Sequence, residues 1–462
     1  MNQSMSDTIA AISTAKGKSA LSVIRISGPK TFELLAKIVK SKINFEKLQL
    51  KESKKVFRKM YKANFYDENR LIDEGMICLF KAPSSFTGED MAELYCHGND
   101  FIVSQVLESI LRYCRLATKG EFTLRAFLNR KIDLTQAEAI ANLLSAQTKK
   151  AQKAALLQLE GRLKTNISSI LSDITKLRVI FELAIDFVED EVPEFDIENL
   201  LKDIDDIIFR LQSLINTAHD GIVVQNGIKI CLAGAPNVGK SSIFNAFLQT
   251  ERAIVTPIPG TTRDYIEEAF ALSGYLIRLF DTAGIRDSQD TVEKIGIERS
   301  LSLIQTADIV FYVTTNEISE DINNEFLALL PPSKTIKVIN KADLLTYEQQ
   351  ENFVKQAYVL CSAVQGKEVD GLKNLKEKLL ANFNNIDDEL ENGVITNSRQ
   401  LSCVKNCLDS VLKAKEGLLN ENGIDFVAFD IQQASNALEN IIGRISNDDI
   451  LNKIFDNFCI GK

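Results

Sequence analysis

The spacing of apolar positions divides the chain into three patterns. Over residues 1–118, short β-branched runs such as ALSVIRISG and EGMICLF alternate with turns and with amphipathic segments such as TFELLAKIVK. This predicts a compact α+β domain. Over residues 119–218, apolar residues recur at three- and four-residue spacing, as in LTQAEAIANLLSAQTKKAQKAALLQLEG, with almost no proline or glycine. Long helices are therefore expected there.

A third pattern covers residues 219–383. The run IKICLA leads into a glycine-rich turn, and YLIRLF, ADIVFYVTT, TIKVIN and YVLC follow at helix-length intervals. Such alternation is typical of βαβ units on a parallel sheet. Residues 384–462 return to the helical pattern. We therefore expect a multidomain α/β and α protein, in which the α/β domain is inserted into a discontinuous helical domain formed by 119–218 and 384–462.

The composition argues against several classes of protein, among them zinc proteins and disulfide-rich secreted proteins. The chain has 462 residues, eight cysteines without a C-x-x-C pair and only two histidines, which argues against a zinc site and a disulfide framework. Most cysteines are expected to be buried thiols. The net charge of −9 argues against a nonspecific nucleic-acid coat, although the basic stretch KESKKVFRKMYK could hold RNA. The first residues resemble no targeting segment and no apolar run could span a membrane, so we expect a cytoplasmic protein.

The segment GAPNVGKSS, residues 234–242, matches the phosphate-binding pattern G-x-x-x-x-G-K-[ST] and follows a predicted strand. Glycines allow the backbone N–H groups to surround phosphates, Lys240 can reach the β and γ oxygens, and the Ser241 hydroxyl can bind Mg²⁺. A chance glycine loop is the alternative for this motif taken alone.

Three further motifs follow in order. DTAG follows the second predicted strand of this domain. Its carboxylate can hold the metal's water shell, and its glycine N–H can contact the γ-phosphate. NKAD supplies Asp343, whose oxygens can accept from guanine N1–H and the 2-amino group, and CSA can close over the base. PGTTRD lies where a nucleotide-sensing switch belongs, with Thr262 as the second hydroxyl on Mg²⁺. Together they predict a Ras-like P-loop GTPase domain. The predicted GTP-binding residues are Asn237, Val238, Gly239, Lys240, Ser241, Ser242, Thr256, Thr261, Thr262, Asp281, Thr282, Ala283, Gly284, Asn340, Lys341, Asp343, Ser362 and Ala363.

Ile285 stands directly after DTAG, where Ras-like enzymes carry a glutamine that orients the attacking water. Another group must therefore assist hydrolysis. Glu293 is a candidate for orienting the water, and the Asn237 side-chain oxygen could ligate a monovalent cation in place of an arginine finger. Arg263 and Arg286 are rival charge donors, and each could equally be an ordinary solvent-facing switch residue.

The sequence as a whole resembles the MnmE (TrmE) family of tRNA wobble-uridine modification GTPases. The resemblance covers essentially the whole chain and is carried by VIRISGP, SFTGEDMAELYCHG, GEFTLRAFLNRKIDLTQAEAI, the nucleotide motifs, VEKIGIERS and the terminal FCIGK. It implies an N-terminal α+β domain that dimerises and binds folate, a helical domain made of two segments, and an inserted Ras-like domain.

The resemblance also implies a function. Together with the FAD protein MnmG (GidA), in a heterotetramer, the protein would add an aminomethyl-type (carboxymethylaminomethyl) group to C5 of the tRNA wobble uridine. A 5,10-methylene- or 5-formyl-tetrahydrofolate would supply the one-carbon unit. Potassium-dependent dimerisation of the GTPase domains is a family trait, with hydrolysis stimulated by potassium, and the implied potassium ligands are Asn237, Thr256, Ile258 and Thr261.

Carried over motif by motif, the folate-contacting positions are Arg25, Glu93, Lys131 and Lys462. A pterin edge offers N–H donors suited to a carboxylate, and the anionic glutamate tail suits Arg or Lys. Without the resemblance, Arg25 could simply end a strand and Lys131 could lie in a surface turn.

Cys459 stands four places from the end of the chain, in FDNFCIGK. One face of a predicted last helix carries Ile450, Leu451, Ile454, Phe455 and Phe458, which argues against a free tail. Gly461 and Lys462 match a prenylation signal poorly. The alternative is that Cys459 is a buried thiol that only fills space in the core, called the buried-filler alternative below. The resemblance implies an active-site thiol, without deciding between nucleophile, acid and positioning group.

Two other classes compete with this interpretation. A ribosome-maturation GTPase, acting as an assembly switch without chemistry of its own, would share the nucleotide motifs but would usually append an RNA-binding module. A membrane-remodelling GTPase would need a lipid-binding tip, which the helical segments do not plainly offer.

Overall fold

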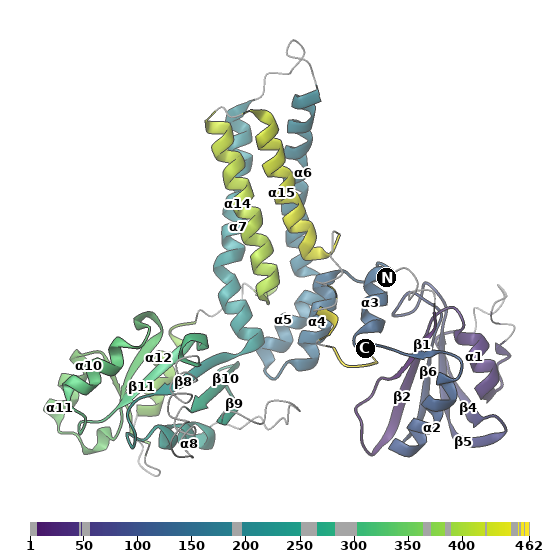
Figure 1. The fold of residues 1–462 in the computed structure, drawn as a ribbon, viewed down its shortest axis with the longest axis horizontal. Helices are drawn as coiled ribbons and strands as arrows, with labels where there is room; N and C mark the ends of the chain where they lie inside the picture. The colour runs from purple at the N-terminus through teal and green to yellow at the C-terminus, as the bar shows by residue number, and fades with distance from the viewer. Residues whose placement is uncertain are drawn as a thin grey trace, which may run out of the picture. The chain divides into compact units, whose positions relative to one another are not determined.

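The computed structural model describes residues 7–45, 48, 56–186, 196–250, 266–281, 303–363, 371–383, 390–420, 423–444, 451, 454–456 and 458–461. The chain forms two compact units, residues 1–141 with 439–462 and residues 142–438. Figure 1 shows the α+β domain, the long helices and the α/β domain that the patterns predict, and this fold class is confirmed.

The first unit is built on a seven-stranded sheet of order β3-β4-β5-β6-β2-β1-β7. Its neighbouring strands pair antiparallel, except β1 with β7, which are parallel. The elements are β1 (Ile9–Ile12), β2 (Ser19–Ser27), α1 (Thr31–Ile38), β3 (Val39–Ser41), β4 (Met60–Asp67), β5 (Arg70–Phe80), β6 (Met91–Gly98), α2 (Asp100–Leu111), β7 (Arg115–Leu116) and α3 (Glu121–Leu128), and α4 (Leu134–Ser145) leads into the second unit.

Side chains alternate across the sheet of this unit because a strand has a period of two. Ile24 and Ile26 of β2 are buried in the core cluster that includes residues of α1 and α2. Arg25, between them, points to the other face, where its strand partner is Glu93 of β6. The alternation thus places a charged pair on the face opposite the main core.

Long helices from before and after the α/β domain in the chain make up one part of the second unit. Helix α7 contacts both α6 and α14, and the axes of α6, α7, α14 and α15 run in nearly the same direction in Figure 1. Their apolar stripes are buried, as at Ile170, Leu211 and Val404, which is the packing that three- and four-residue spacing predicts. The helices are α5 (Lys149–Leu159), α6 (Arg162–Asp186), α7 (Ile197–Asn226), α14 (Ser398–Leu419) and α15 (Ile424–Ile442).

The α/β domain lies between α7 and α14 in the chain. Its six-stranded sheet has the order β13-β12-β11-β8-β10-β9 and is parallel except for β9 with β10. The elements are β8 (Ile228–Ala233), α8 (Lys240–Thr250), β9 (Ile266–Leu272), β10 (Tyr275–Asp281), β11 (Ile309–Thr314), α10 (Glu320–Ala328), β12 (Thr335–Ile339), α11 (Tyr347–Lys355), β13 (Tyr358–Leu360), α12 (Gly371–Leu380) and the short 3₁₀ turns η4 (Pro332–Lys334) and η5 (Ala342–Leu344).

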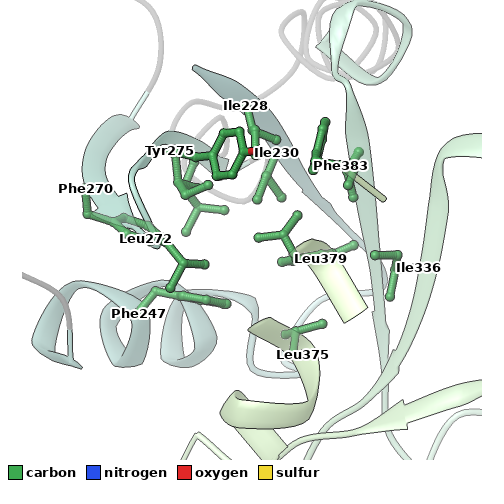
Figure 2. Packing of buried hydrophobic residues seen from close by; sticks show 14 of the residues in the cluster. Ile228, Ile230, Phe247, Phe270, Leu272, Tyr275, Ile336, Leu375, Leu379 and Phe383 are labelled. Carbon is green, nitrogen blue, oxygen red and sulfur yellow. The ribbon is translucent and has the colours of Figure 1, made fainter. Parts of the chain in front are cut away.

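Aromatic and aliphatic side chains from both the strands and the helices fill the core of this domain. Phe247 of α8 stacks with Phe270 of β9 at 5.6 Å between ring centroids, and Leu375 and Leu379 of α12 lie in the same cluster (Figure 2). The cluster fixes α8, and with it the loop before α8, against the sheet.

Strand β9 was not predicted, so counting the DTAG strand as the second of the domain was wrong. β9 comes first and pairs antiparallel with β10 through a two-residue turn at Ser273 and Gly274. Both turn residues have positive φ, 50° and 86°, as a type I′ hairpin turn requires. The Ser-Gly pair in FALSGYLI was a usable signal for this hairpin.

Helix α7 also differs from the prediction, because it runs to Asn226, past the change of pattern at residue 218. The β-branched run IVV, which resembles a strand, forms the last turns of the helix. Gly227 ends it with φ 84°, a conformation that glycine adopts without strain. The domain boundaries themselves stay a prediction.

Candidate functional site

The glycine-rich loop follows β8 directly and is closely packed. Gly234 has φ 143°, and a Cβ there would lie 2.1 Å from the Val313 carbonyl oxygen. Gly239 has φ 92°, and a Cβ would lie 2.2 Å from Asn340 Nδ2. Asn237 between them adopts φ 65°. Glycine is therefore required at both ends of the turn, and the backbone is free to surround an anion.

Lys240 begins α8 and is held over this loop. Its side chain is only 7% exposed, and Nζ donates to the carbonyl oxygens of Gly234 at 2.9 Å and Ala235 at 2.8 Å. The ammonium group and the amide groups at the start of α8 together make a phosphate-binding position. Ser241 and Ser242 follow on the exposed side of the first turn.

The NKAD motif lies beside the same loop, since parallel strands bring their carboxyl ends to one edge of the sheet. Asn340 Nδ2 donates to the Val238 carbonyl at 2.9 Å and so ties the base-recognition motif to the phosphate loop. Asn340 Oδ1 is buried and has no partner among the described residues. A buried acceptor of this kind is costly unless something donates to it.

The CSA motif follows β13 and meets the NKAD motif. The Ser362 hydroxyl donates to Asp343 Oδ1 at 2.6 Å, and Ala342 N–H donates to the Cys361 carbonyl at 2.9 Å. Ser362 thus orients the carboxylate predicted to recognise guanine. The structure therefore brings the phosphate loop, NKAD and CSA together, as the order of motifs predicted.

Several predicted site residues lie outside the described residues. Asp281 ends β10, next to β8, but the remaining residues of the DTAG motif, the switch and the following loop are not described. These are Thr256, Ile258, Thr261, Thr262, Arg263, Thr282, Ala283, Gly284, Arg286 and Glu293, together with Lys462 at the chain end.

Two of the predicted folate-contacting residues pair in the first unit. Arg25 Nε lies 2.9 Å from Glu93 Oε1, and the Tyr95 hydroxyl donates to Glu93 Oε2 at 2.6 Å. Burial, followed by the hydrogen bond to Glu93, raises the pKa of Tyr95. The Phe86 ring lies 6.0 Å from the Arg25 guanidinium carbon. Arg25 is thus not a simple strand end.

Lys131, the third predicted residue, is tied to the loop that carries Phe86. Its Nζ donates to the Pro83 carbonyl at 3.0 Å, and the neighbouring Asn129 Nδ2 donates to the Thr87 carbonyl at 2.7 Å. The segment after α3 is therefore fixed against residues 81–90. Arg25, paired with Glu93, and Lys131 thus contact the same loop.

Sequence reasoning missed a buried arginine behind this loop. Arg125 is 2% exposed and donates to Asp7, Glu89 and Glu121. Glu89 in turn accepts from the Ser27 hydroxyl at 2.7 Å. The i,i+4 pair in GEFTLRAF, Glu121 with Arg125, was a signal that the analysis did not use.

The C-terminal tail is anchored on the same unit. Ile460 forms a β-bridge with Lys119, Gly120 N–H donates to the Cys459 carbonyl at 3.3 Å, and the Ser13 hydroxyl donates to the Gly461 carbonyl at 3.0 Å. The Cys459 side chain is exposed, so the buried-filler alternative is wrong. The thiol stands on an anchored segment beside the end of β1, which is the strand next to β2.

The remaining cysteines behave mostly as expected. Burial raises the pKa of Cys361 to about 12 and of Cys96 to about 11, so neither is a reactive thiol. The buried cysteines are Cys78, Cys96, Cys231, Cys361 and Cys407, while Cys114 and Cys403 are half-buried. Within the described part of the chain, no cluster of His, Cys, Asp or Glu could hold a metal ion.

The same described residues include no helix both long and apolar enough to cross a membrane.

A phosphate loop after β8, joined to NKAD and CSA motifs at the same sheet edge, defines a P-loop GTPase. Two family models match the chain, "GTP-binding protein TrmE N-terminus" over residues 8–131 and "MnmE helical domain" over residues 134–459. The chain belongs to the MnmE family of tRNA modification GTPases, which confirms the resemblance found in the sequence.

Curated relatives match over nearly the full length. The tRNA modification GTPase MnmE of Aquifex aeolicus is 39% identical over 99% of this chain and 100% of that protein. The protein of the same name from Carboxydothermus hydrogenoformans is 38% identical, again over 99% and 100%. Among solved structures, the G domain of the T. maritima FeoB iron transporter is 30% identical, with a TM-score of 0.25, and covers 33% of this chain and 97% of that one.

Proposed function

We propose that this GTPase acts with an FAD-dependent partner, MnmG (GidA), to add an aminomethyl-type group to C5 of the wobble uridine, U34, of certain tRNAs. A tetrahydrofolate derivative would supply the one-carbon unit. Membership of the family supports tRNA modification and GTP hydrolysis. The observation that carries the finer proposal is the Arg25–Glu93 pair, with Lys131 tied to the adjoining loop.

The chemistry of this pair suits a folate. A carboxylate has about four acceptor positions, so Glu93 keeps capacity for pterin N–H donors after accepting from Arg25 and Tyr95. Lys131 and Lys462 are cations suited to the anionic glutamate tail. The half-exposed ring of Phe86 offers a flat apolar surface for the pterin.

The test is a titration of the full-length protein with 5-formyl-tetrahydrofolate. Saturable binding is expected, with Glu93→Gln weakening affinity by about tenfold, because a charge-assisted hydrogen bond is lost. Lys131→Ala should weaken it less. Lys30→Ala, at an exposed position, is the matched control. Binding that is absent, or equally tight in Glu93→Gln, would contradict the proposal.

We propose that the nucleotide site binds GTP together with Mg²⁺. Asn340 Oδ1 lacks a donor among the described residues, and a side chain at Gly239 would clash with Asn340, so the phosphate loop keeps its bare backbone there. We propose that Ser241 and Thr262 bind the magnesium ion. Mg²⁺ would neutralise charge on the phosphates when bound.

We further propose that Asn237, with Thr256, Ile258 and Thr261, binds K⁺, which would supply positive charge where an arginine finger otherwise stands. The exposed Asn237 side chain in the phosphate loop supports this assignment. Glu293 is proposed to orient water, with Arg263 and Arg286 as rival charge donors, and Cys459 remains a proposed site thiol.

The proposals about the partner and the assembly rest on what the resemblance to the family implies. We propose a homodimer through the N-terminal domain, a heterotetramer with MnmG, a cytoplasmic location and domains at 1–118, 119–218, 219–383 and 384–462. Nucleoside analysis of tRNA from cells lacking the gene is the deciding experiment. Loss of the modified wobble uridine is expected, and unchanged uridines would contradict the proposed function.

A further inference from the structure

The β9–β10 hairpin joins the two segments that the motifs assign to nucleotide sensing. β9 begins directly after residues 251–265, which contain PGTTRD, and β10 ends at Asp281, the first residue of DTAG. The register runs unbroken from the pair Leu272–Tyr275 to the pair Ile266–Asp281. β10 also pairs in parallel with β8, the strand that precedes the phosphate loop, so the position of the hairpin bears on both far ends and on that loop.

The turn of this hairpin packs on helix α5, which lies outside the α/β domain in the sequence. The Lys150 stem passes over Gly274, where a Cβ would lie 3.0 Å from Lys150 Cγ. Lys150 Nζ lies 4.6 Å from the centroid of the Tyr275 ring, within the range of a cation–π interaction. Ala151, the next residue of α5, belongs to the same buried cluster as Tyr275.

β10 is fixed from a second side by the end of α7. Arg278 Nε donates to the Asn226 carbonyl at 3.1 Å. A Cβ on Gly227 would lie 2.8 Å from the Leu276 carbonyl oxygen, so the two backbones touch. The hairpin is therefore held between α5 at its turn and α7 along β10.

Helix α5 also holds the segment by which the chain leaves the α/β domain. Lys153 forms an ion pair with Glu391 at 2.8 Å. Gln158 Oε1 accepts from the Thr396 hydroxyl at 2.9 Å, where both side chains are buried. One helix thus contacts the hairpin turn and the exit segment together.

We infer that Lys150 is a positioning residue for GTP hydrolysis. It fixes the β9–β10 turn on α5 and thereby keeps the end of β10 at Asp281 in the arrangement that hydrolysis requires. The inference rests on the GTPase activity of the family and is independent of the folate and potassium proposals.

The test is steady-state GTP hydrolysis by the full-length protein and its Lys150→Met variant. Methionine keeps an apolar stem over Gly274 but removes the charge from the Tyr275 ring. We expect kcat to fall about two- to fivefold, the rate equivalent of one cation–π contact, while KM for GTP and the thermal midpoint stay close to wild type. Lys150→Arg keeps a cation over the ring and should restore kcat.

Lys149→Met is the matched control, because Lys149 is the exposed neighbour on the same helix. An unchanged kcat in Lys150→Met, an equal loss in Lys149→Met, or no recovery in Lys150→Arg would each overturn the inference. A lowered thermal midpoint with unchanged kcat would mean a structural role and would also overturn it. Hydrolysis by the wild-type protein in the same assay distinguishes failure of this inference from failure of the family activity.

Discussion

At the scale of single residues, the predicted recognition of guanine depends on one oriented carboxylate. Ser362 donates to one oxygen of Asp343, and Asn340 ties the motif to the phosphate loop. A carboxylate held in this way can accept two hydrogen bonds from guanine, whereas adenine would leave it unsatisfied.

Asp343→Asn should therefore change base preference. The amide still accepts one hydrogen bond but presents a donor where guanine also donates, so GTP affinity should fall by about 100-fold. Xanthosine triphosphate, which carries a carbonyl at that edge, should bind the variant better than GTP. Competition binding with the two nucleotides measures this, and an unchanged preference for GTP would show that the carboxylate does not contact the base.

Glu121 predicts a pH dependence at the same scale. Burial alone would raise the pKa of Glu121, but hydrogen bonds from Arg115, the Thr118 backbone and Arg125 lower it to about 2 from 4.5. Because the folded-state pKa is the lower one, the resulting stability is present above about pH 4.5 and is lost as the pH falls toward 2. Where Glu121 is fully ionised, this contribution to the free energy of unfolding is about 3 kcal/mol.

Hydrogen exchange of peptides covering residues 115–128 can measure this effect between about pH 5 and pH 3. Wild-type protection should fall more steeply with acid than protection in Glu121→Gln, once the intrinsic pH dependence of exchange is removed. Parallel profiles in the two proteins would mean that Glu121 titrates normally.

At the scale of elements, the docking of the tail depends on the residue before α3. Gly120 has φ 64°, and a Cβ there would lie 3.0 Å from Phe455 Cδ1 and from Phe458 Cβ. These two rings belong to the cluster that holds the last described segment against α3 and α4. The position of Cys459 is thus decided by a glycine far away in the sequence.

Gly120→Ala should loosen the tail. The left-handed conformation and the close contacts with Phe455 and Phe458 together should cost about 1–3 kcal/mol, and the Cys459 thiol should react faster with an alkylating agent as the segment detaches. Alkylation followed by mass spectrometry measures the rate. Lys119→Ala, at the exposed neighbouring position, is the control, and equal rates in the two variants would argue against the role given to Gly120.

At the scale of the whole molecule, the proposed potassium site connects hydrolysis to assembly. Ile285 cannot orient water, and Asn237 occupies an exposed position of the phosphate loop. GTP turnover per protomer should therefore be at least about tenfold faster in potassium than in sodium buffer, and it should rise with protein concentration if G domains pair. Asn237→Ala should remove the difference between the two ions. Equal rates in both buffers would refute a cation-assisted mechanism.

The sequence determined the order of the domains and the nucleotide chemistry. Strand runs such as IKICLA and motifs such as GAPNVGKSS are local patterns. The residues within each segment are enough to specify its backbone conformation. The hairpin at Ser273 and Gly274 was also local, and its turn signal was present but unused.

Only the tertiary structure decided which distant residues meet. Arg25 reaches Glu93 because β2 pairs with β6, and Lys150 reaches the β9–β10 turn because α5 packs beside the α/β domain. Such contacts depend on register and helix packing, which no local pattern encodes. The burial of Arg125 shows the same limit, because charge alone would have placed it at the surface.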